Sequence, residues 1–321
     1  MHASLRSSLR PAAVFVCMAT FGSLMLSTAA YADEPLFGFV YTTDLLPKGK
    51  WEVAQWATWR AHKAHGRYNV VELRNEVEYG GTDNLQLSAY INYEWANAFH
   101  NNVMDGSTLV PETFAQLSVD PDDKFETTRL TGVAGEVIWR VLSPYTDGVG
   151  LALYIEPTIG PALRELESRI ILQKNFLDDR IVLAFNATIA QEWRRLQADP
   201  TADPDSSDFI EHWDKETDVN FGLAGSYRFA PSWSAGVELI NEREWAGLSP
   251  LASSKRTNTA YYFGPTLHYA GAHVFATLTA VDQLPWGADA ANPRPGFVVS
   301  GRNYADDFER FRVRLKIGYY F

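Results

Sequence analysis

Charged side chains recur at every second position in several stretches of this 321-residue chain. Guanidinium, ammonium and carboxylate groups in such rows can hold ionic solutes, or select them along a narrow water-filled path. The spacing places each row on one face of an extended strand, because successive side chains of a strand point to opposite faces. The residues that we expect to line a lumen are Glu72, Arg74, Glu76, Glu94, Glu136, Arg140, Glu156, Glu192, Arg194, Glu238, Arg310, Arg312, Arg314 and Lys316.

The C-terminal stretch indicates what must position these charges. Four cations alternate with an apolar row that begins at Phe311 and continues through Val313, Leu315, Ile317, Tyr319 and Phe321. In a bilayer the apolar row meets lipid and the charged row meets a wet lumen. The five residues from Val313 onward resemble the C-terminal targeting strand of bacterial outer-membrane barrels. A soluble β-sandwich is the alternative, but its exposed apolar edge would invite aggregation, whereas barrel closure removes the edge.

The same alternation predicts about twelve strands, each long enough to cross a bilayer when tilted. We expect them at 49–61, 67–80, 84–96, 127–142, 148–160, 163–176, 180–195, 217–229, 232–244, 257–269, 273–283 and 307–321. Most connections alternate between short Gly/Pro/Asp turns and long loops, as in bacterial outer-membrane proteins. The predicted fold is therefore all-β: a single antiparallel transmembrane barrel with short periplasmic turns and longer extracellular loops.

The first 32 residues have the pattern of a cleaved secretory signal peptide. Arg6 and Arg10 precede an apolar run, and Ala30-Tyr31-Ala32 forms an A-x-A cleavage site. We assign 33–48 to a periplasmic N-terminal segment and 49–321 to the barrel. The predicted location is the bacterial outer membrane.

Composition and motifs exclude several classes of protein. Lys and Arg number 28 against 39 Asp and Glu, so no basic excess exists to neutralise a nucleic acid. One cysteine excludes a disulfide scaffold, and no later stretch has the eighteen uncharged apolar residues of a membrane helix. No GxSxG, HExxH or P-loop pattern occurs. We therefore expect no enzyme, no cofactor, no catalytic residues and no resident metal; an acidic segment at 199–216 lacks EF-hand spacing and is expected to be solvated.

The N-terminal third carries a resemblance to a known family. Tyr41 through Gln55, followed by Val77-Glu78-Tyr79-Gly80 and Thr82-Asp83-Asn84, resembles the opening of an uncharacterised proteobacterial outer-membrane family, DUF6662. The chain is also distantly similar to outer-membrane transporters of aromatic degradation. Both resemblances imply a barrel, and neither implies catalytic residues.

Three functions remain open at this stage. The leading one is a pore or facilitator for small polar or aromatic solutes with a charged lumen. The second is a closed structural or interaction barrel whose loops bind a partner or lipopolysaccharide, and the third is an outer-membrane hydrolase. The long segment 97–126 either folds inward as a constriction or is a solvated loop. Expected partners are outer-membrane lipid and lipopolysaccharide, the barrel-assembly machinery during insertion, and a small-molecule solute.

Overall fold

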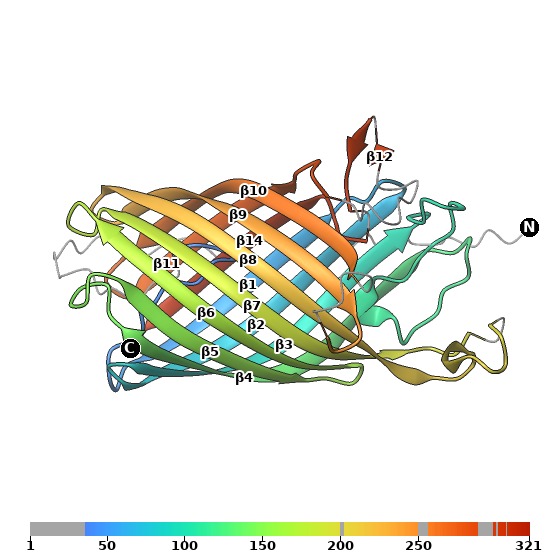
Figure 1. Cartoon of the computed structure of the whole chain (residues 1–321), viewed down its shortest axis with the longest axis horizontal. Coiled ribbons are helices and arrows are strands. Elements are labelled where there is room, and N and C mark those ends of the chain that lie inside the picture. Colours follow the sequence, from blue (N-terminus) through green and yellow to red (C-terminus); the bar gives the residue numbers. More distant parts are fainter. Residues whose placement is uncertain (1–35, 200–201, 250–255, 288–297, 300, 306) are drawn as a thin grey trace, which may run out of the picture.

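Twelve antiparallel strands form a closed barrel in the computed structural model (Figure 1). The structure describes residues 36–199, 202–249, 256–287, 298–299, 301–305 and 307–321. The predicted signal peptide lies outside these residues. Within the described part, no helix is long and apolar enough to cross a membrane.

The strands agree closely with the alternation in the sequence. They are β1 (Trp51–Ala61), β2 (Arg67–Thr82), β3 (Leu85–Phe99), β4 (Phe125–Leu142), β5 (Gly150–Ile159), β6 (Leu163–Phe176), β7 (Ile181–Leu196), β8 (His212–Ala230), β9 (Trp233–Ala246), β10 (Arg256–Ala270), β11 (Val274–Gln283) and β14 (Phe311–Tyr320). A separate two-stranded hairpin is formed by β12 (Val298–Val299) and β13 (Arg302–Asn303). It belongs to the segment of chain that connects β11 to β14, which are themselves paired in the barrel. The predicted all-β barrel is confirmed.

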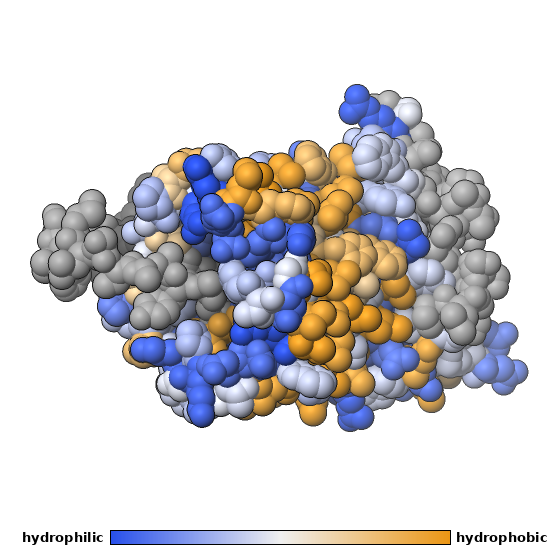
Figure 2. Space-filling model, turned by 60° about the vertical axis from the view of Figure 1, so that its left-hand side comes forward, coloured by the Kyte–Doolittle hydropathy of each residue, from blue (hydrophilic) through white to orange (hydrophobic). Residues whose placement is uncertain are grey.

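The outer wall is apolar and the inner wall is polar or small. Ile155 on β5 is 43% exposed, whereas the preceding Tyr154 is 5% exposed. Apolar side chains gather on the outer wall in Figure 2, as they do where a barrel faces lipid. Aromatic side chains flank this band, including Trp51 packed on Tyr79 with ring centroids 4.5 Å apart. This exterior, on a closed barrel, places the protein in the bacterial outer membrane.

Closure brings the two ends of the chain together. β14 pairs with β1 on one side and with β11 on the other. In that register Arg312 lies opposite Arg60, and Arg314 lies opposite Thr58. The expected cationic row therefore stands beside the first strand, and no strand edge of the barrel is left unpaired.

The two ends of the barrel differ. Short turns and the C terminus lie together on the left in Figure 1, and the longer loops lie on the right. Two of these loops contain single 3-10 turns, η1 (Glu112–Phe114) and η2 (Ser207–Phe209). The loop between β7 and β8 is the acidic segment noted in the sequence.

The N-terminal segment does not lie outside the barrel. Residues 36–46, which we call the plug segment, run through the lumen and contact the inner faces of β3, β6, β7, β9 and β11. The segment predicted as a periplasmic extension is thus inside the barrel from residue 36 onward. The physical reason is that its apolar side chains, such as the fully buried Phe37, find an apolar patch on the inner wall.

Candidate functional site

The plug segment is held in the lumen by side chains of the barrel wall that form hydrogen bonds with its backbone N–H and carbonyl groups. The carboxylate of Glu238 accepts hydrogen bonds from the N–H groups of Gly38, Phe39 and Val40 at 2.7, 2.8 and 3.0 Å. Asn186 accepts from the Tyr41 N–H at 2.7 Å and donates to the Tyr41 carbonyl at 2.9 Å. A segment without secondary structure can be buried only when its peptide groups are paired in this way.

Two glutamines and apolar packing complete the attachment. Gln173 accepts from the Thr43 N–H at 2.6 Å, and Gln86 accepts from the Leu46 N–H at 2.8 Å. Leu45 packs among inward residues of β4, β5 and β6. A Cβ at Gly38 would lie 2.6 Å from the Thr279 Cβ, so only glycine allows this close approach.

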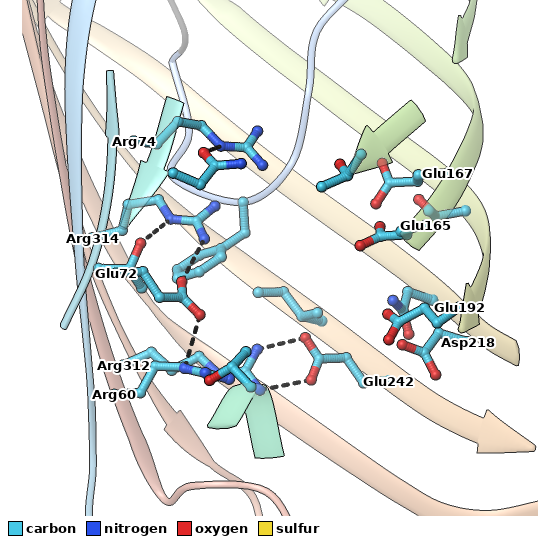
Figure 3. A pocket seen from close by; sticks show the side chains of 18 of the residues that line it. Arg60, Glu72, Arg74, Glu165, Glu167, Glu192, Asp218, Glu242, Arg312 and Arg314 are labelled. Carbon is cyan, nitrogen blue, oxygen red and sulfur yellow. Dashed lines mark hydrogen bonds and ion pairs between the residues drawn. The ribbon is translucent and has the colours of Figure 1, made fainter. Parts of the chain in front are cut away.

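A cavity of about 410 Å³ lies between the plug segment and the long loops. In Figure 3 arginines gather on one wall of this cavity, and most of the labelled carboxylates lie across from them. Among the described residues, six arginines and twelve carboxylates line it. Its surplus charge is therefore negative, which favours cations over anions in a narrow lumen.

The arginines of this cavity are paired. Arg60 Nε lies 2.9 Å from Glu72, and its Nη2 lies 3.1 Å from Glu94. Arg74 forms a bidentate pair with Glu156, in which Nη2 donates to Oε1 at 3.1 Å and Nη1 donates to Oε2 at 3.2 Å. Bidentate pairs of this kind fix the guanidinium in place. Their positive charges are therefore largely neutralised by acidic side chains of the barrel itself.

Arg314 and Arg312 belong to the same wall. The Arg314 Nε donates to Thr58 at 2.8 Å, and its guanidinium lies 4.2 Å from the ring centroid of Phe39. Arg312 Nη2 donates to Glu242 at 2.7 Å and to the Tyr262 hydroxyl at 3.1 Å. The last strand therefore touches both the plug segment and the far wall.

The opposite wall carries the surplus acids. Glu165 and Glu192 line the cavity from β6 and β7, and Asp218 and Glu244 line it from β8 and β9. Oxygens of Glu216, Asp218 and Glu244 lie within 4.8 Å of one another. Arg194, beside them, pairs with Glu192 and with Glu112. This wall offers carboxylates that a cationic solute can approach.

Two loops narrow the outer mouth. Glu112 and Thr113 of η1 line the cavity, and the next residue, Phe114, is fully buried against the inner wall. Phe308 and Glu309 reach the cavity from the loop before β14. The segment 97–126 was expected either to fold inward as a constriction or to be a solvated loop. In the structure its residues Glu112–Phe114 fold inward.

Comparison with known families settles the chain's membership. Residues 29–321 match DUF6662, a family of unknown function. The chain belongs to this family. No curated protein matches the chain.

Three solved outer-membrane proteins are among those similar to this DUF6662 chain. The COG4313 outer membrane channel from Pseudomonas putida F1 is 12% identical with a TM-score of 0.53, over 92% of this chain and 100% of that one. The NanC porin is 11% identical with a TM-score of 0.45, over 83% and 98%. The CymD monoaromatic hydrocarbon channel is 9% identical with a TM-score of 0.35, over 86% and 88%. At these identities the first likeness supports the fold.

The predicted lumen residues of this DUF6662 barrel fall into separate places. Those that line the large cavity are Glu72, Arg74, Glu94, Glu156, Glu192, Arg194, Arg312 and Arg314. Glu76 and Lys316 line a smaller cavity near the short turns. Glu136 is buried and accepts hydrogen bonds from the hydroxyls of Ser88 and Tyr90. Glu238 accepts from the backbone of the plug segment.

Two of the predicted residues lie at the barrel ends, away from the large cavity. Arg140 reaches the carbonyls of Asp83 and Thr43 beside the short turns. Arg310 precedes β14, and its guanidinium lies 4.0 Å from the ring centroid of Tyr304. Both residues are near the end of a strand, Arg140 in β4 and Arg310 just before β14. Alternation predicts which face a side chain is on, but it does not predict how far along the barrel axis the side chain lies.

Sequence reasoning missed the plug contacts and Asp218. Asp218 lies inside the predicted strand 217–229 and shares its face with Asn220 and Gly222, so following that inward row back by one more position would have found it. The predicted strand began at 217, after the observed start of β8 at His212, because residues 212–216 are polar except for Trp213. For the plug segment, the apolar run Leu36–Tyr41 was the available signal.

Glu309 makes the mouth sensitive to acid. Burial opposes its ionisation, but the charges of Arg312 and Arg60 outweigh burial and lower the pKa of Glu309 below its ordinary 4.5. A lowered pKa means that the ionised group stabilises the folded mouth above pH 4.5 and that this contribution is lost as the pH falls below it. We expect the protection of 307–312 against hydrogen exchange, measured relative to the intrinsic exchange rate at each pH, to fall below pH 4.5. In Glu309→Gln the exchange should be fast and should lose this dependence; an unchanged profile would contradict the assignment.

Proposed function

We propose that this protein is an outer-membrane channel for small polar or aromatic solutes that prefers cations to anions. The observation that carries the proposal is the charge of the cavity, where twelve carboxylates face six arginines. Because Arg60, Arg74 and Arg312 are committed to ion pairs, the surplus carboxylates determine the field that a passing solute meets.

The size and lining of the cavity limit the solute. About 410 Å³ accommodates a small molecule or a short chain and not a folded domain. Rings of Tyr41, Trp56 and Tyr154 line the same space. Aromatic faces attract cations and stack on planar solutes, so amines and aromatic compounds both suit this surface.

The plug segment favours a second candidate, a closed barrel. Its contacts span the inner wall from β11 to β3 and leave the large cavity bounded on the side of the short turns. In that case the long loops carry the function by binding a partner or lipopolysaccharide. In either case β14, with the terminal Phe321 that follows it, serves insertion by the barrel-assembly machinery. No observation on the described residues favours a hydrolase; the buried His268 ring contacts Thr277 Oγ1 at 2.8 Å.

Planar-bilayer recording tests the first candidate. Openings of the purified protein, and of a variant that lacks the plug segment, should reverse at a potential that shows potassium preferred over chloride across a potassium chloride gradient. Glu165→Gln combined with Asp218→Asn should weaken that preference, because both acids face the cavity. The exposed Glu211→Gln serves as the matched control. Openings without cation preference would reject the selectivity, and no openings in any variant would reject the channel.

A further inference from the structure

Three cations and two tryptophans form one surface at the long-loop ends of β6, β7 and β8. Arg164 on β6 lies directly opposite Trp193 on β7, and Trp193 lies directly opposite Lys215 on β8. Arg195, two residues after Trp193, lies opposite Trp213. Residues that are directly opposite in an antiparallel pair share one face of the sheet. We call these five residues the rim patch.

The exposed apolar residues of the same strands show which way the rim patch faces. Leu166 and Ile170 on β6 are 38% and 49% exposed, and Ile189 on β7 is 37% exposed. Each is an even number of positions from Arg164 or Trp193 on its own strand, so their side chains share a face. The rim patch is therefore on the outer wall, next to the apolar band and outside the lumen.

The two tryptophans indicate the depth of the rim patch in the membrane. Indole rings favour the boundary between lipid and water. The guanidinium of Arg164 lies 4.7 Å from the ring centroid of Trp213, so cations and rings lie at the same level. A cation on the lipid side of a barrel is costly at the midplane and much less so near the interface. At the long-loop end, that interface contains the headgroups of the outer leaflet.

Two of the three cations are available to a ligand. Arg195 is partly neutralised, because its Nε lies 3.3 Å from Glu211. Within the described part of the chain, no carboxylate forms an ion pair with Arg164 or Lys215. Both side chains are exposed. The rim patch therefore keeps a positive charge at headgroup depth, where it attracts anionic lipid.

We propose that the rim patch binds the phosphate groups of an outer-leaflet glycolipid, the chemical class of lipopolysaccharide. The guanidinium of Arg164 can donate two parallel hydrogen bonds to one phosphate, and Lys215 adds a point charge. The two residues are two strands apart, which separates their Cα atoms by about 10 Å. A headgroup with more than one phosphate can contact both cations. The proposal does not rest on the channel, since the rim patch lies outside the lumen.

Equilibrium binding of radiolabelled lipid A to the full chain in detergent micelles tests the site. The wild type should bind diphosphorylated lipid A saturably and the dephosphorylated form much more weakly. Arg164→Gln combined with Lys215→Gln should weaken binding of the diphosphorylated form roughly twenty-five-fold, because each cation at a lipid surface contributes about fivefold.

A matched pair of cations at the other end of the barrel is the control. Lys174 is on the outward face of β6 near the short turns, and Arg180 is in the turn that follows β6; both are exposed. Lys174→Gln combined with Arg180→Gln removes the same net charge and should bind diphosphorylated lipid A as the wild type does. Heat-dependent gel migration checks that each variant is a folded barrel.

Three results would overturn the proposal. The first is equal affinity of the two double variants for diphosphorylated lipid A, which would show that net charge alone attracts it. The second is equal binding of both forms of lipid A by the wild type. The third is displacement of lipid A by inorganic phosphate at the concentration of lipid A, which would make the rim patch a site for the free anion.

Inorganic phosphate at that concentration is expected to leave lipid A bound.

Discussion

A barrel without residues 36–46 is expected to open frequently in planar bilayers, whereas the wild type is expected to be closed most of the time. Backbone N–H groups of the plug segment donate to side chains of five strands. The segment lies between the large cavity and the short turns. Its removal leaves an inner wall of mainly small and polar residues that water can fill. Single-channel recording of the two proteins measures the difference.

A milder variant tests the same mechanism without deleting chain. Glu238→Gln keeps the shape of the anchor, but its single amide oxygen accepts neutral hydrogen bonds on one side only, and its NH2 group cannot accept from the N–H groups on the other. We expect the plugged state to lose roughly 2 kcal/mol, which is about thirtyfold in the closed-to-open ratio. Glu211→Gln, exposed on a loop, should change nothing. A deletion variant that migrates as a folded barrel but never conducts would support the closed-barrel candidate instead.

Arg312→Ala is expected to lower the free energy of unfolding by about 3–5 kcal/mol. Arg312 is buried between Glu242 and Glu309, and it also donates to Tyr262. Its loss leaves Glu309, which is 2% exposed, with Arg60 at 3.9 Å as its ion-pair partner among the described residues. Urea titration in lipid vesicles, followed by tryptophan fluorescence, measures the change.

An exposed ion pair provides the control for this effect. Arg195 pairs with Glu211, and their side chains are 38% and 56% exposed. Arg195→Ala should therefore cost less than about 1 kcal/mol, since water screens the pair. Equal losses in the two variants would show that the pairs of Arg312 do not stabilise the barrel.

Much of the barrel could be predicted from local pattern. β6 begins and ends where the alternation predicts, at Leu163 and Phe176. β8 begins earlier than expected, at His212, because the stretch before Asp218 is polar apart from Trp213 and is held by pairing with β7. Alternation detects a strand only where lipid lies on one side, so the parts that extend into water carry a weaker signal.

The lumen was predictable only in part. The charge rows indicated which faces are inward, and eight of the predicted residues line the large cavity. The ion-pair partners of those residues were not predictable. Knowing that a side chain points into the lumen does not show which side chain of the opposite wall it meets. Arg74, for example, meets Glu156 from a strand three positions away in the barrel order.

The sequence by itself determined the strands, the lipid-facing row, the order of turns and loops, and the net acidity of the chain. These are properties of neighbours along the chain, since a period of two and a turn residue act locally. The tertiary structure decided that the first segment after the predicted signal peptide returns into the lumen. Glu238 binds Gly38 across 200 positions, and such a contact exists only after closure places both residues inside the same wall.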